Sequence, residues 1–172
     1  MKPKKGELEA AVEFSLHVCQ RGEADWPSIC QELCVFDQQF ASFVSSKKAA
    51  YEFTLSIVSV QLHAVTNLFE SAQSGRIRSH VLECFTNEEV GNYPVEAIAA
   101  YDAAWDEAFA QREAPFGAVA AVLSHKLGLK PNLIFARVTL FNPIILSTLG
   151  MVIFRFEAGW WKKHIEAYDT VA

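Results

Sequence analysis

Residues 47–73 form a long segment with two apolar faces, and no other feature of this 172-residue chain constrains the fold as strongly. Apolar residues recur there at alternating spacings of four and three, which is the period of an α-helix. A second apolar stripe runs on nearly the opposite side, and a polar seam containing His63 separates the two stripes. A helix covered on both faces lies inside a bundle or against a second subunit. The two stripes are Tyr51, Leu55, Val58, Leu62, Val65, Phe69 and Ala72, and Phe53, Ile57, Val60, Ala64 and Leu68.

The chain is long enough to bury a proper core, and neither a linker nor an internal repeat divides it. Half of its residues are apolar, so nothing in its composition indicates disorder. We therefore predict a single all-α domain over residues 1–172, a bundle of five to seven helices around the segment at 47–73. The second apolar stripe would be covered by the C-terminal helix or by another copy of the chain, and we expect a homodimer.

Capping and turn residues predict where the helices begin and end. A first helix should run from Glu7 to Gln20 and end at Arg21–Gly22. The next should begin near Asp25 and carry an apolar stripe to Phe43. Ser74–Gly75 should close the long helix. The later predicted helices are Arg76–Phe85, Pro94–Glu113 and one from Pro115 to a stop at Gly128.

The C-terminal part admits two interpretations. Asn142–Pro143 is a strong helix start, so residues 131–141 and 143–168 are predicted as two helices. However, Ile134, Ala136, Val138 and Leu140 alternate, as a strand would. The runner-up fold is therefore α+β with a short C-terminal strand pair, and whether residues 132–156 are helical or extended stays open.

Charge and cysteine usage narrow the partners and the compartment. The net charge of −5 and the lack of a basic face argue against nucleic acid as a partner. No secretory signal opens the chain, and its four cysteines show no compact disulfide pattern, so we expect a cytoplasmic protein with reduced thiols.

Membrane association is an alternative interpretation of this chain. The apolar window Leu133–Phe154 is interrupted by Arg137 and Asn142–Pro143, so it is too short to span a bilayer, which takes about 20 residues. A buried core helix is favoured. The following Trp160–Lys163 nevertheless resembles an interfacial anchor, which leaves peripheral membrane association as an alternative.

Two further patterns could hold a metal or haem. Cys30 with Cys34, and His80 with Cys84, each share a helix face and together could bind zinc, but the spacing differs from common zinc modules. Buried thiols explain these residues more simply, so no metal is favoured. His63 or His125 could ligate a haem iron, whereas a di-iron bundle is excluded because no Glu-x-x-His occurs.

The sequence also suggests a ligand-binding region. Tyr101, Trp105 and Phe109 should lie on the buried side of the helix that begins at Pro94, which would leave Asp102 and Asp106 as solvated carboxylates. Two arginines interrupt apolar segments, and a buried guanidinium needs a partner. If there is a pocket, we predict that its polar end is formed by Arg137 and Arg155.

Motifs for hydrolase, phosphate-binding, dinucleotide-binding and metalloprotease chemistry are lacking. The leading interpretation is a non-enzymatic protein without a cofactor, which binds a small hydrophobic ligand or a partner protein through an aromatic-rich apolar surface. A metal- or haem-containing bundle enzyme is the alternative from a different functional class.

Overall fold

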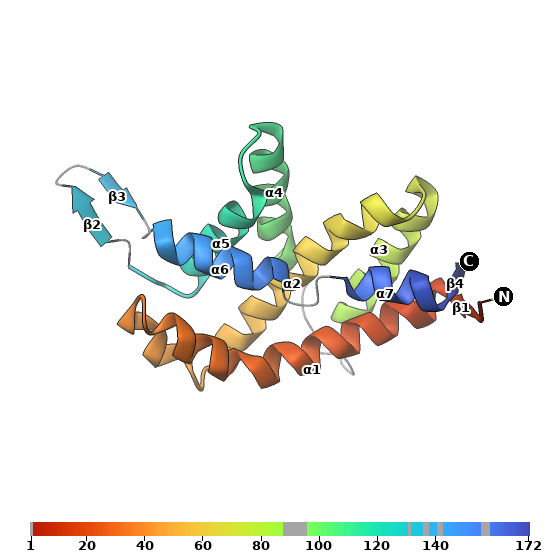
Figure 1. Ribbon diagram of the computed structural model, residues 1–172, viewed down its shortest axis with the longest axis horizontal. Coiled ribbons are helices and arrows are strands. Elements are labelled where there is room, and N and C mark those ends of the chain that lie inside the picture. Colours follow the sequence, from red (N-terminus) through yellow and green to blue (C-terminus); the bar gives the residue numbers. More distant parts are fainter. Residues whose placement is uncertain (1, 88–95, 131, 136–137, 141–142, 156–158) are drawn as a thin grey trace.

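The computed structural model describes residues 2–87, 96–130, 132–135, 138–140, 143–155 and 159–172 (Figure 1). Helices dominate this part of the chain, and its four strands are short, so the predicted all-α bundle is confirmed. The helices are α1 (Glu7–Leu33), η1 (Gln38–Phe43, a 3₁₀ helix), α2 (Lys47–Leu68), α3 (Ser71–Thr86), α4 (Glu96–Ala110), α5 (Pro115–Lys126), α6 (Pro143–Arg155) and α7 (Trp160–Ala167). The strands are β1 (Lys4–Gly6), β2 (Asn132–Phe135), β3 (Val138–Leu140) and β4 (Asp169–Val171).

Helix α2 is the centre of the fold, as its two apolar stripes predict. It begins at Lys47, where the Ser46 side chain caps it by accepting a hydrogen bond from the Ala49 amide. Every residue from Glu52 to Leu62 is buried. Helix α2 contacts all the other α-helices of the described chain, so it is surrounded by neighbours from the same chain.

Helix α1 is longer than predicted, because Gly22 does not end it. The helix continues through Gly22 and Pro27 to Leu33. A Cβ atom on Gly22 would lie 2.1 Å from Thr54 Oγ1, so glycine allows α1 and α2 to cross closely at this point. The glycine that we interpreted as a stop is thus a packing residue. The helix predicted from Asp25 to Phe43 is instead the end of α1 followed by η1.

The break after the long helix also differs from the prediction. Helix α2 ends at Leu68, and α3 starts at Ser71, so Ser74 and Gly75 lie inside α3 rather than between helices. Phe69 and Glu70 are extended and turn the chain. Helix α3 then packs along α1, where the Arg76 guanidinium binds the buried carboxylate of Glu7 through two hydrogen bonds of 2.8 and 2.9 Å.

The predicted helix over residues 131–141 is wrong where the structure describes this segment. β2 and β3 form an antiparallel pair, the extended alternative that the alternating pattern allowed. Residues 131, 136–137 and 141 lie outside the described residues, and so does the predicted pocket residue Arg137. The predicted single helix over 143–168 is also divided, since α7 begins after Gly159, which has a positive φ of 95°.

The two ends of the chain lie side by side (Figure 1). β1 pairs in parallel with β4, with Lys4 opposite Asp169. Helix α7 packs near the start of α1, where the ring centroids of Phe14 and Trp161 are 4.9 Å apart. The aromatic C-terminal segment is therefore docked on the N-terminal part of α1.

Candidate functional site

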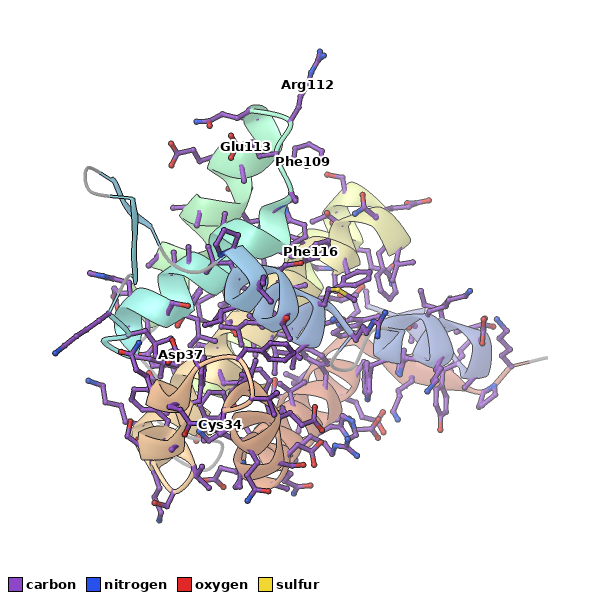
Figure 2. All side chains as sticks on the ribbon, turned by 60° about the vertical axis from the view of Figure 1, so that its left-hand side comes forward. Cys34, Asp37, Phe109, Arg112, Glu113 and Phe116 are labelled. Carbon is purple, nitrogen blue, oxygen red and sulfur yellow. The ribbon has the colours of Figure 1, made fainter. Side chains whose placement is uncertain are left out.

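An apolar groove over α4, α5 and α6 is the strongest candidate site. Three adjoining pockets of about 630, 370 and 350 Å³ share Phe116, and we call them together the Phe116 groove. All three are partly open to solvent. Figure 2 shows Phe109, Arg112 and Glu113 at the tip of the hairpin formed by α4 and α5, with Phe116 nearer the body of the molecule. The groove therefore begins at this tip and continues toward α6.

Large apolar side chains line the groove without being covered. Phe109 is 71% exposed, and Met151 and Phe154 are each 47% exposed. Phe154 stacks at a tilt on Phe116, with ring centroids 4.4 Å apart. Close approach of α6 to α5 is possible because Gly150 has no Cβ, which would lie 3.0 Å from the Phe116 carbonyl oxygen. Apolar residues gathered in this way mark binding surfaces more often than ones scattered singly.

Trp105 forms the wall between the groove and a polar cluster. One side of its indole lies near Phe116, with an interplanar angle of 79°. The His63 imidazole stacks nearly parallel on the indole at 11°, with a centroid distance of 4.8 Å. Trp105 thus depends on α2 for its position and contributes to the groove from α4.

Asp102 is the centre of this polar cluster. Its carboxylate accepts a hydrogen bond of 2.6 Å from the Ser59 hydroxyl and an ion-paired hydrogen bond from Arg78. His63 Nε2 lies 3.5 Å from Asp102 Oδ1, while His63 Nδ1 lies 3.9 Å from Asp106 Oδ1. These contacts tie α4 to both α2 and α3.

The environment of Asp102 keeps it ionised. Burial alone would raise the pKa of its carboxyl group, but the contacts with His63, Ser59 and Arg78 outweigh burial and hold the pKa below its ordinary value. Its side chain is only 17% exposed, so the prediction of a solvated carboxylate is wrong for Asp102. Asp106, at 73% exposed, is solvated as predicted.

The three aromatic residues that were predicted to bind a ligand do not all line one pocket. Trp105 and Phe109 line the same pocket, with Phe116 opposite them. Tyr101 is fully buried and donates a 2.9 Å hydrogen bond to Glu52, so it supports the core instead. Phe109 is exposed, contrary to prediction, because the buried stripe of α4 follows Ile98, Tyr101 and Ala108.

Arg155 does not reach the Phe116 groove. It is exposed at the end of α6 and lines a different pocket with residues of α1 such as Asp25 and Glu32. The structure therefore gives Arg155 a polar setting between α1 and α6. It is not brought to the pocket formed by Trp105 and Phe109.

The proposed zinc ligands do not meet. Cys84 lies beside Ser15, which is 15 residues before Cys30 on the same helix, or about 22 Å at 1.5 Å per residue. His80 instead contacts Glu83 at 3.5 Å. Among the described residues, no group of three His, Cys, Asp or Glu side chains could hold a metal ion. Burial raises the pKa of the Cys19 and Cys30 thiols to about 12, which keeps both protonated.

The two proposed haem ligands do not face an apolar pocket. Both ring nitrogens of His63 point toward carboxylates of α4, and its ring face is taken by Trp105. His125 is exposed at the end of α5. This arrangement supports a positioning role for His63 rather than ligation of iron.

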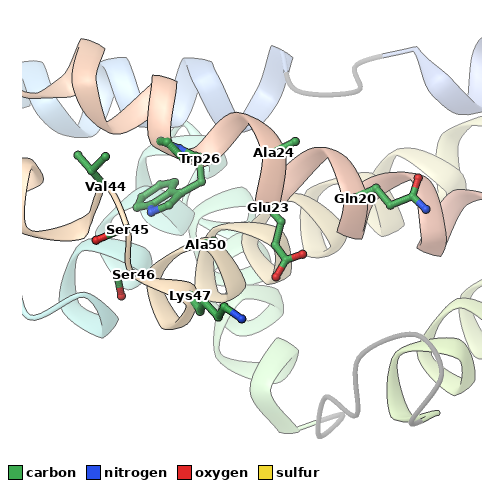
Figure 3. Close-up of a pocket in the computed structure, with 10 residues that line it drawn as sticks. Gln20, Glu23, Ala24, Trp26, Val44, Ser45, Ser46, Lys47 and Ala50 are labelled. Atoms are coloured by element: carbon green, nitrogen blue, oxygen red, sulfur yellow. The ribbon is translucent and has the colours of Figure 1, made fainter.

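A second pocket, of about 470 Å³, lies between α1 and the start of α2 (Figure 3). Trp26 forms part of its wall, and its indole N–H donates to the Phe43 carbonyl at 2.9 Å. The Ser46 hydroxyl is used as the helix cap. Because these polar groups are already engaged, this pocket is a weaker candidate than the Phe116 groove.

One stretch, Pro143–Ala167, is long and apolar enough to cross a membrane by length and composition, and it includes residues 156–158, which lie outside the described residues. A third of its most apolar window, 33%, is buried. The buried core helix of a soluble protein satisfies the same criterion of length and composition.

We compared the chain with protein-family models, curated proteins and solved structures, and none of them matches it.

Sequence reasoning missed several residues of the site. Phe116 and Phe154 were not singled out, because their exposure depends on how three helices meet. Ser59 and Arg78 were also missed. One signal was available: Ser59 and His63 are four residues apart on α2, as are Asp102 and Asp106 on α4. Matched polar pairs with this spacing can face each other across two helices.

Proposed function

We propose that this chain is a non-enzymatic binding protein whose Phe116 groove holds the apolar face of a partner helix. The observation that carries the proposal is the set of three adjoining pockets around Phe116, beside which Phe109, Met151 and Phe154 remain exposed. Sites for small molecules usually enclose most of the ligand surface, whereas the three pockets of this groove are each partly open to solvent. An open apolar groove suits the side chains of an amphipathic helix.

The polar cluster behind Trp105 supports this function without chemistry of its own. The Ser59 hydroxyl is fully buried and its proton is donated to Asp102, so it is not placed as a nucleophile. The cluster instead holds α4 against α2 and α3 and thereby fixes Trp105. Binding grooves gain affinity when their walls are held in place before the partner arrives.

Binding of a labelled amphipathic peptide of about 18 residues, with leucines at helical spacing, tests the proposal by fluorescence anisotropy. We expect measurable binding that weakens at least about tenfold in Phe109→Asp and Phe154→Asp. Both side chains are exposed enough for these changes to leave the core intact. Val35→Asp is the matched control, because Val35 is 81% exposed outside the groove. Equal binding by all variants, or no binding by the native protein, would contradict the proposal.

Native mass spectrometry distinguishes binding of a partner protein from binding of a small hydrophobic ligand. A partner-binding groove predicts that the native mass equals the mass of the polypeptide or a multiple of it. An additional non-covalent mass, lost on denaturation and absent from Phe154→Asp, would indicate a small hydrophobic ligand in the groove instead.

A further inference from the structure

Helix α7 begins with aromatic and basic side chains next to one another. Its first four residues, Trp160–Lys163, place two indoles beside two exposed lysines. Trp161 is buried against Phe14 and Phe69, at centroid distances of 4.9 and 5.9 Å. Tryptophan and lysine are the residues that anchor a helix at a membrane surface. In the docked state this apolar surface is turned into the protein.

The docked state leaves polar atoms of this segment without partners. Trp161 Nε1, His164 Nε2 and Thr170 Oγ1 are buried without a hydrogen bond, and they are three of the five such atoms in the described chain. A buried polar group without a partner costs stability relative to one in contact with water. At a membrane interface the indole N–H and the imidazole would meet water and lipid headgroups. Docking of α7 is therefore less favourable than its apolar contacts suggest.

His164 is only 5% exposed in the docked state, so a positive charge on its ring would lose contact with water. Its ring stacks on Trp160 at 5.3 Å and lies 5.2 Å from the ring of Tyr168. From β1, the ammonium group of Lys5 lies over the Tyr168 ring at 4.3 Å. Two acidic side chains of α1, Glu9 and Glu13, face the site as well. Glu13 is already paired with Lys5, at 2.5 Å.

The titration of His164 follows from this setting. Burial, together with the Lys5 charge, lowers the pKa of His164, while Glu13 and Glu9 act in the opposite direction. A released His164 would have the ordinary pKa, near 6.5. As the pH falls below that value, the released state binds a proton that the docked state does not. Acidification therefore shifts the equilibrium toward release.

We propose that α7 is an acid-released membrane anchor. Protonation of His164 frees α7 from α1 and β4 from β1, so that Trp160, Trp161 and the adjacent lysines bind an anionic lipid surface. In the released segment, Lys162, Lys163 and the protonated His164 outnumber the carboxylates of Glu166 and Asp169. Anionic lipids attract such a segment, and the indoles enter the interface.

Co-sedimentation of the full chain with vesicles tests the anchor. With phosphatidylcholine vesicles containing about 30% phosphatidylserine, we expect the bound fraction to rise at least about fivefold from about pH 7.5 to about pH 5. Vesicles of phosphatidylcholine alone should bind little at either pH. Lys162→Ser/Lys163→Ser, which changes exposed side chains only, should lose most of the binding at the lower pH. The proposal would be overturned if the fraction of native protein bound to phosphatidylserine vesicles did not rise on acidification. It would also be overturned if the lysine variant bound as much as the native protein at the lower pH.

His164→Phe tests the trigger, since it keeps an aromatic ring between Trp160 and Tyr168 but cannot be protonated. We expect its binding at about pH 5 to stay near the neutral level. His125→Phe, a change at an exposed histidine of α5, is the matched control and should bind as the native protein does. Hydrogen exchange without vesicles, corrected for the intrinsic effect of pH, should show loss of protection in Trp160–Ala167 on acidification. Acid binding by His164→Phe equal to that of the control would overturn the assigned trigger.

Discussion

Gly22 of α1 lies so close to Thr54 of α2 that a Cβ atom on the glycine would be 2.1 Å from the threonine Oγ1. The Thr54 hydroxyl donates to the Ala50 carbonyl at 2.9 Å, so its position is fixed within α2. The crossing of the two longest helices thus depends on one missing methyl group. This contact explains why a residue that usually ends helices lies in the middle of α1.

Gly22→Ala should destabilise the protein by about 1–3 kcal/mol, because the added methyl group overpacks the crossing. Urea denaturation measures the free energy of unfolding. Gly75→Ala is the matched control: Gly75 is inside α3, nothing lies within 4 Å of the position that its methyl group would take, and alanine should be neutral or stabilising by up to about 1 kcal/mol. Adding Thr54→Ala to Gly22→Ala should recover part of the loss. A Gly22→Ala variant as stable as Gly75→Ala would show that the helices can separate at little cost.

Asp102→Asn should lower the free energy of unfolding at about pH 7 by roughly 1–3 kcal/mol, since it removes the charge to which Arg78 and Ser59 bind. Asp106→Asn should change it by less than about 0.5 kcal/mol, because Asp106 is well exposed. Urea denaturation of both variants at the same pH measures the two differences. A difference of the same size for both aspartates would contradict the assigned role of Asp102.

The same carboxylate predicts a pH dependence. Because its pKa is lower in the folded protein than in the unfolded chain, the unfolded chain binds the proton first on acidification. The stabilisation is complete above the ordinary pKa, about 3.9, and is lost as the pH falls through the folded value. The stability difference between the native protein and Asp102→Asn should therefore shrink below about pH 4. A constant difference down to about pH 2 would exclude this linkage.

Tyr101→Phe should destabilise the protein by about 1–3 kcal/mol, because it leaves the Glu52 carboxylate buried without the phenol that now donates to it. Glu52→Leu in the same chain should reduce this cost, since the buried charge is then removed as well. Burial also raises the pKa of Tyr101, so its phenol should resist ionisation at alkaline pH. Absorbance near 295 nm that shows all four tyrosines ionising together would argue against a buried Tyr101.

The cysteines should differ in reactivity with iodoacetamide. Burial raises the pKa of Cys19 and Cys30 to about 12, so both should react slowly in the folded protein at about pH 8. All four should react in urea. Mass spectrometry of the modified peptides gives the rate for each cysteine. Fast modification of Cys30 in the folded protein would show that α1 opens locally near its C-terminal end.

Some parts of the fold follow from short-range patterns. The two stripes of α2 predicted a central helix, and the start of α5 at Pro115 and its end before Gly128 follow from local backbone preferences. Other local signals were misleading. Gly22 and Ser74–Gly75 resemble helix ends, yet they lie inside helices because packing against neighbouring helices outweighs the propensity of single residues. The alternation of apolar residues over 132–140 did not decide between helix and strand. In the described part of this segment, the pairing of β2 with β3 makes the chain extended.

The candidate site was predictable to a lesser degree. Trp105 and Phe109 were identified from their spacing, but the spacing cannot say which of them is covered. Phe109 is exposed because α4 extends past the core at its tip. Asp102 is half-buried because α2 and α3 bring Ser59, His63 and Arg78 to it. By itself the sequence determined that the chain is helical and that α2 is central, since periodic apolar stripes must be buried wherever the helices go. Only the tertiary structure decided which aromatic side chains form a groove, because exposure depends on contacts between helices that are distant in the sequence.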